Sequence, residues 1–208
     1  MVLRRSNCLI AAFAAIVVAT ALLMVARPGR AQVPATAHAG ELLVASPSIL
    51  DPHFGHAVIL MVHHDQGGAM GIVINMPVEK RSMADILKML GEKDSKVSGT
   101  VQIFAGGPVQ PTTGFVIHSP DYRGPGTIDI DKDLRLTATL QILRDIGNGK
   151  GPRQSIVAFG YAGWAPGQLE DELKRGIWFV VPGDPKLIFD EDRDKVWNSA
   201  YARRAEDL

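Results

Sequence analysis

Four of the six histidines fall between His53 and His64, and histidine is both a common metal ligand and a common general base. A metal ion needs three or four ligands that converge on one point. A proline and a glycine in this segment predict a loop around His53 and His56, while the adjacent His63 and His64 at a strand end would point to opposite faces. We therefore expect no metal site, but exposed loop histidines and one packed residue, His63.

A hydrolytic triad, in which a histidine takes the proton of a serine and a carboxylate orients the histidine, is the second chemistry to consider. The sequence has no Gly-x-Ser-x-Gly elbow, and its serines also suit turns and helix caps. A hydrolase-like enzyme therefore stands as an alternative function, with no catalytic residue assigned. The residues available to it are Ser46 or Ser119 as nucleophile, His118 or His63 as base, and Glu170 or Asp65 as its partner.

The densest combination of glycines and large aromatics is 159–173, FGYAGWAPGQLEDEL. It predicts a tight strand-to-helix turn in which the backbone approaches another group closely. Binding sites gather at such strand ends, although Tyr161 and Trp164 could equally fill a corner of the core, and both interpretations stay open. The predicted ligand or partner surface comprises Gly106, Gly107, Pro108, His118, Tyr161, Trp164, Gln168 and Glu170.

Other glycine-rich segments occur at 67–71, 106–107 and 147–151. None has the Gly-x-Gly-x-x-Gly spacing of a dinucleotide site or the Gly-Lys-Ser/Thr ending of a phosphate loop. We expect no cofactor.

The elements that must position these residues are short apolar runs and amphipathic segments. The runs 57–63 and 69–75 flank turn residues and predict a hairpin of buried strands, and Ser82 with Asp85 has the spacing of a capping box. Because strands arrive both as hairpins and after helices, the pattern favours an α+β fold with a mixed or antiparallel sheet. The remaining expected strands are 42–46, 101–105, 114–118, 155–159 and 178–181, and the expected helices are 82–90, 137–146, one from Pro166 to Gly176, and 194–204.

The first 31 residues have the order of an export signal. Arg4 and Arg5 precede an apolar run from Leu9 to Val25, which a small-residue segment follows. This run is longer than a usual signal core, so an uncleaved membrane anchor is the alternative. We expect a signal or anchor at 1–31, a flexible lead-in at 32–39 and a folded domain at 40–208.

Charge and cysteine content exclude several classes. After residue 31, 18 basic and 22 acidic residues remain, so the folded part is net acidic, which argues against nucleic acid as a partner. Cys8 is the only cysteine, so an internal disulfide and a cysteine-rich zinc site are excluded.

Five phrases resemble the bacterial AlgH/YqgE family, in that family's order. They are GELLVASPSILDPHF from Gly40, HHDQGGAMGIVINMP from His63, GGPV from Gly106, GFVIH from Gly114 and GYAGWAPGQLEDEL from Gly160. The resemblance covers nearly the whole folded part.

This resemblance implies a single α+β domain, with a mixed, mostly antiparallel bifurcated sheet partly closed into a small barrel and about four helices. It implies no agreed catalytic residue or cofactor, and it carries the label of transcriptional regulator. The chain departs from the family in its export-like leader and in His56, where a basic residue is usual.

We therefore expect a non-catalytic binding or regulatory domain in the bacterial envelope, periplasmic or anchored through 1–31. The Gly106 and Gly160 loops would contact a small ligand or a protein partner. The alternatives are the hydrolase-like enzyme and a cytoplasmic, transcription-linked regulator.

The localisation can be tested with a reporter fused after Leu208. Because the leader has the order of an export signal, a reporter that works only outside the cytoplasm should be active in the fusion, and deletion of residues 1–31 should abolish its activity. A fusion whose reporter works only in the cytoplasm would contradict export.

Overall fold

The computed structural model describes residues 36–92, 96–190 and 192–204, all of which belong to the compact unit Val33–Leu208. The signal or anchor expected at 1–31 lies outside the described residues. Ala37, in the expected lead-in, is fully buried. Among the described helices, none is long and apolar enough to cross a membrane.

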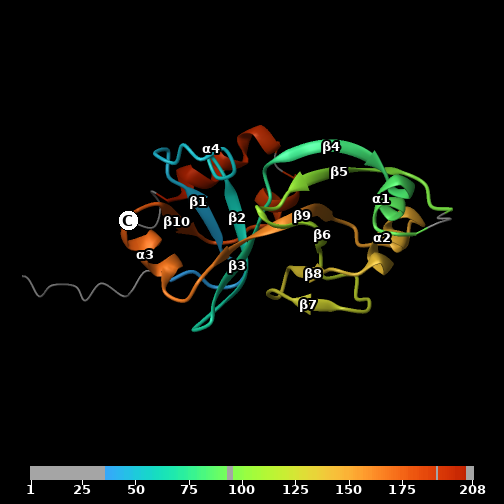
Figure 1. The fold of residues 1–208 in the computed structure, drawn as a ribbon, viewed down its shortest axis with the longest axis horizontal. Helices are drawn as coiled ribbons and strands as arrows, with labels where there is room; N and C mark the ends of the chain where they lie inside the picture. The colour runs from blue at the N-terminus through green and yellow to red at the C-terminus, as the bar shows by residue number, and fades with distance from the viewer. Residues whose placement is uncertain (1–35, 93–95, 191, 205–208) are drawn as a thin grey trace, which may run out of the picture. The chain divides into compact units, whose positions relative to one another are not determined.

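A mixed, mostly antiparallel sheet of ten strands, curled into a half-barrel, organises the described domain (Figure 1). Its main path runs β10-β1-β2-β3-β9-β6-β8-β7. Off this path, β5 pairs with β9, and β4 pairs with β5. The strands are β1 Leu42–Ala45, β2 Val58–Asp65, β3 Gly68–Val73, β4 Pro77–Ser82, β5 Thr100–Ala105, β6 Val109–His118, β7 Thr127–Asp129, β8 Arg135–Thr137, β9 Ser155–Trp164 and β10 Trp178–Val181.

Strand β9 is where the sheet divides. Its first half pairs in parallel with β5, through Val157 to Phe159, and antiparallel with β6. Its last residues, Ala162 to Trp164, pair antiparallel with β3. These pairings confirm the α+β class and the bifurcated sheet.

Four α-helices and one π-helical turn are present in the described residues. In Figure 1, α1 and α2 lie together beyond β5, whereas α3 lies beside β10, and α4 packs near β1 and β2. Ser82 caps α1 by accepting a hydrogen bond from the Asp85 amide (3.1 Å), as its spacing predicts. The helices are α1 Met83–Met89, α2 Leu140–Gly147, α3 Gln168–Lys174, the π-helix η1 Lys186–Asp190 and α4 Arg193–Arg203.

Two expectations about the glycine-rich stretch are wrong. The strand expected to end at Phe159 continues to Trp164, so Gly160 lies inside β9 rather than in a loop. The helix expected from Pro166 begins at Gln168, after Gly167 in the left-handed conformation, so the turn is confined to 165–167. Sequence inspection also missed β4, β7 and β8.

Three glycines, Gly106, Gly107 and Gly160, allow the connection between β5 and β6 to cross very close to the backbone of β9. The Gly106 amide donates to the Phe159 carbonyl (2.8 Å). A Cβ on Gly107, whose φ is 148°, would lie 2.2 Å from the Tyr161 carbonyl carbon, and one on Gly160 would lie 2.2 Å from the Gly107 carbonyl oxygen. Only glycine fits such an approach, so these residues fix how β9 passes the β5–β6 connection.

Gly107→Ala tests this crossing, and Gly149→Ala is its matched control. Gly149 also has a positive φ, 69°, but a Cβ there would meet nothing within 4 Å. The control should lose about 1 kcal/mol from left-handed strain alone, and Gly107→Ala about 3 kcal/mol or more because backbone must move as well. Denaturant unfolding measures both. Equal losses would show that the crossing tolerates a side chain.

Candidate functional site

His118 is a core residue. Its side chain is fully buried, its Nδ1 donates to the Ser119 carbonyl (2.9 Å), and its Nε2 accepts from the Thr137 hydroxyl (2.9 Å). Burial, the largest cause, lowers the pKa of His118 from its usual 6.5. With both ring nitrogens engaged, this neutral imidazole is placed to hold β6 against β8.

The packed histidine of the pair 63–64 is His64, which corrects the expectation for His63. A bulge between Met61 and His63 shifts the alternation of β2, so the His63 side chain is 62% exposed and that of His64 only 8%. His64 Nδ1 bonds the Ala37 carbonyl (2.7 Å), and its Nε2 bonds Glu170 (2.9 Å). Glu170 thus ties the start of α3 to β2.

In the described residues, the candidate triad serines make their hydroxyl hydrogen bonds to groups other than the candidate histidines. Exposed His63 contacts Asp65 (2.9 Å), while Ser46 shares a hydrogen bond with a neighbouring serine and Ser119 donates to Asp121. That last bond is the largest cause lowering the pKa of Asp121 to about 2. Across residues 36–92, 96–190 and 192–204, no serine hydroxyl bonds a histidine ring, and no group of three or more His, Cys, Asp or Glu could hold a metal.

Tyr161 and Trp164 lie on different sides of β9. Tyr161 packs edge-on against Phe115 (ring centroids 6.0 Å apart) in one apolar cluster. Trp164, only 7% exposed, lies in another cluster and meets Trp178 edge-on (6.1 Å). The alternation of strand side chains puts residues three apart on opposite faces, so the two aromatics pack in different clusters, although both also line one hollow beside His63.

Glu172, which accepts hydrogen bonds from two tryptophans, was not among the residues predicted from the sequence. The indole nitrogens of Trp164 and Trp178 both donate to Glu172 Oε2, at 2.8 and 2.7 Å, and the Gln168 amide donates to Oε1 (2.9 Å). The only signal in the sequence is the four-residue spacing of Gln168 and Glu172 on a helix. The indoles come from β9 and β10, which the sequence does not place side by side.

An apolar hollow, which we call the β4 groove, has a volume of about 580 Å³. It lies between the β4–β5 ribbon, α1 and the β5–β6 connection, and Gly107 and Pro108 of the predicted surface line it. The other lining residues are His53, Val78, Glu79, Arg81, Ile86, Met89, Leu90, Ile103, Phe104, Ala105, Pro111, Thr112 and Phe159.

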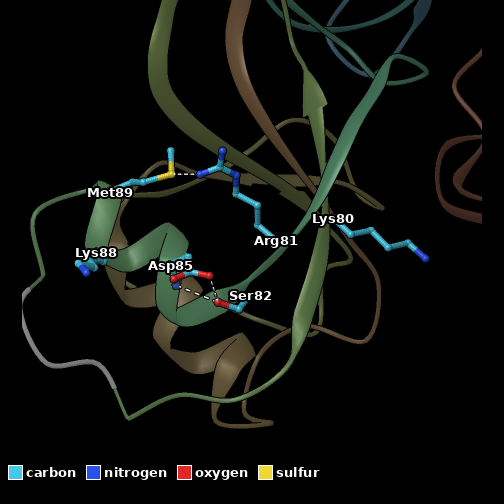
Figure 2. Close-up of a pocket in the computed structure, with 6 residues that line it drawn as sticks. All are labelled: Lys80, Arg81, Ser82, Asp85, Lys88 and Met89. Carbon is cyan, nitrogen blue, oxygen red and sulfur yellow. Dashed lines mark hydrogen bonds between the residues drawn. The ribbon is translucent and has the colours of Figure 1, made fainter.

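A charged hollow of about 510 Å³ adjoins the groove and shares Arg81 and Met89 with it. Figure 2 shows Arg81 reaching toward the Met89 sulfur, Lys80 extending away from the opposite side of β4, and Lys88 on α1. Arg81 also pairs with Glu79 (2.6 Å). Within the described residues, Lys80 and Lys88 take part in no ion pair.

The predicted surface is therefore divided among several places. Gly107 and Pro108 line the β4 groove, beside the backbone crossing that holds Gly106. Trp164 and Gln168 line a smaller aromatic pocket. Tyr161 and Trp164 both border a third hollow, beside His63. Of the remaining predicted residues, Glu170 bonds His64 and His118 is in the core.

Known proteins resemble this chain over nearly all of its folded part. A family model described as AlgH-like matches residues 42–208. UPF0301 proteins of Sphingopyxis alaskensis and Gluconobacter oxydans are 44% and 42% identical, over 81% and 77% of this chain and 89% and 87% of their own.

Two solved structures share the fold. The solution structure of the AlgH protein from Pseudomonas aeruginosa has a TM-score of 0.70 at 35% identity, covering 81% of this chain and 89% of that one. The crystal structure of protein DIP2367 from Corynebacterium diphtheriae has a TM-score of 0.63 at 21% identity, covering 79% and 86%.

The buried His118 predicts how stability depends on pH. Because its folded-state pKa lies below 6.5, the unfolded chain binds the proton first, so stability is complete above pH 6.5 and falls as the pH drops below it. His118→Gln should lose about 1–3 kcal/mol at neutral pH, and its stability should fall less steeply toward roughly pH 5. Urea unfolding across this range measures the slope, with exposed His53→Gln as control. A slope unchanged in His118→Gln would contradict this assignment.

Proposed function

The chain belongs to the AlgH-like family, and we propose that it is a non-catalytic binding domain whose β4 groove takes an extended segment of a partner protein. The observation that carries this proposal is an apolar groove of about 580 Å³ beside a strand edge that no other strand covers in the described domain.

Exposed apolar side chains support a macromolecular partner. Val78 and Met89 are 63% and 58% exposed, and both line the groove, whose floor includes Ile103 and Phe104. Apolar surface that is gathered along a groove, rather than scattered singly, is typical of a recognition site. Covering it would remove this surface from water, which stabilises a complex.

The edge of β4 supports an extended conformation for that partner. Within the described domain β4 pairs with β5 alone, so backbone groups along its other edge are open to a further strand. Pro77, the bulge at Val78 and the charges of Lys80 and Arg81 are features that discourage indiscriminate edge pairing. They would restrict the groove to segments whose charge complements the edge.

The charges favour an acidic segment. Lys80 and Lys88 have no ion-pair partner in the described residues, and both line the hollow that shares Arg81 with the groove; Figure 2 shows the Arg81 side chain between them. A segment that places apolar residues over Val78 and Met89 and a carboxylate near Lys80 would satisfy both halves of the surface.

The envelope is the compartment that we propose for this binding, because residues 1–31 have the basic-then-apolar order of an export signal. In the alternative, the protein is a cytoplasmic, transcription-linked regulator that binds its partner in the same groove. For the hydrolase-like alternative, the candidate general base is the exposed His63, which contacts Asp65 at 2.9 Å.

A peptide-display selection on the folded domain tests the groove. Selected peptides should be extended, with alternating apolar residues and at least one carboxylate. Val78→Asp should weaken their binding about tenfold or more, because it puts a charge in the apolar groove. Lys80→Glu should weaken it in a salt-dependent way.

Leu50→Asp is the matched control, since Leu50 is an apolar side chain 92% exposed and outside the groove. Fluorescence anisotropy measures all three variants. Peptides that bind Val78→Asp and Lys80→Glu as tightly as the wild type would contradict a role for this groove.

A further inference from the structure

A second hollow, of about 200 Å³, has walls unlike those of the β4 groove. Three aromatic residues line it, and each ring is nearly perpendicular to the next. Phe54 meets Trp178 at 88° with centroids 5.8 Å apart, and Trp178 meets Trp164 at 84°. Trp178 is thus edge-to-face with both other rings, and the faces of aromatic rings carry partial negative charge.

A carboxylate lies in the same wall. Glu172 lines the hollow, and the two indoles and Gln168 hold it in place with three hydrogen bonds of 2.7–2.9 Å. Oε2 accepts two of these bonds and Oε1 only one, so Oε1 keeps acceptor capacity. These hydrogen bonds therefore fix the orientation of the Glu172 carboxylate without neutralising its negative charge.

Among the described residues, Glu172 has no positively charged neighbour in this hollow. Glu172 takes part in no ion pair within the described residues, and the lining of the hollow includes no Lys, Arg or His. Besides the groups already named, the lining is apolar or glycine, with Ile49 and Ile177 as its aliphatic members. A carboxylate beside aromatic rings, both of which attract cations, therefore has no cation from the described residues to pair with.

We propose that this hollow is a binding site for a small alkylammonium ion, such as a free trimethylammonium compound. Aromatic faces attract a cation that carries methyl groups, and Glu172 supplies the opposite charge. A space of about 200 Å³ is smaller than pockets that take drug-sized ligands, which run from about 300 Å³ upward, and suits one compact head group. This site does not depend on the β4 groove.

Choline is the probe, and its neutral isostere, in which a tert-butyl group replaces the trimethylammonium, is the matched ligand control. The chain has three tryptophans, and Trp197, whose indole donates to the Ala45 carbonyl, lies outside the hollow. Choline should therefore shift the indole Nε1–H resonances of Trp164 and Trp178 in a saturable way and leave that of Trp197 in place.

We expect choline to bind at least about tenfold more tightly than the isostere. Glu172→Gln removes the charge with little change of shape and should erase most of that difference. Phe54→Ala, which removes an aromatic wall but no bond to Glu172, should weaken choline binding about fivefold or more and serves if Glu172→Gln does not fold.

Equal binding of choline and the isostere, or an unchanged choline affinity in Glu172→Gln and Phe54→Ala, would overturn the proposal. So would an absence of saturable shifts at Trp164 and Trp178. Phosphatidylcholine vesicles distinguish a lipid source: binding to vesicles without binding of free choline would overturn the assignment to a free ion. These outcomes are independent of peptide binding at the β4 groove.

Discussion

The close passage of two backbones at Gly107 and Gly160 is the constraint on which this fold depends. β9 pairs with β5 before Gly160 and with β3 after it, while β6 pairs with β9 on both sides, at Phe159 and at Tyr161. A side chain at either glycine would overlap the opposing backbone, at 2.2 Å in each case. The crossing therefore decides where one half of the sheet separates from the other, and with it where the hollows form.

The two binding sites that we propose lie on either side of this crossing and share β9. Phe159, just before Gly160, lines the β4 groove, whereas Ala162 and Trp164, just after it, line the aromatic pocket. Their chemistries differ, since the groove is apolar and adjoins a hollow lined by Lys80 and Lys88, whereas the pocket combines aromatic residues with the carboxylate of Glu172. One strand can therefore support two sites that bind ligands of opposite charge.

Sequence reasoning succeeded where the deciding interactions are local. The hairpin of β2 and β3 follows from two apolar runs around turn residues, and the capping of α1 follows from the spacing of Ser82 and Asp85. It failed where distant segments decide. No local sequence pattern predicts the bulge that buries His64 instead of His63. None predicts the contact between His64 and Glu170 either, because they are 106 positions apart in the sequence. Strand β4 was missed because its residues are mostly exposed and lack alternation.

Amide hydrogen exchange of the folded domain, with and without a bound acidic peptide, tests the central claim that β4 is the docking edge. Our account predicts that outward-facing amides of β4, Pro77–Ser82, slow about tenfold or more on binding, because a new strand would bond them. The edge strand β7, Thr127–Asp129, should not change. Slowing at β7, or unchanged exchange along β4 while the peptide is bound, would contradict it.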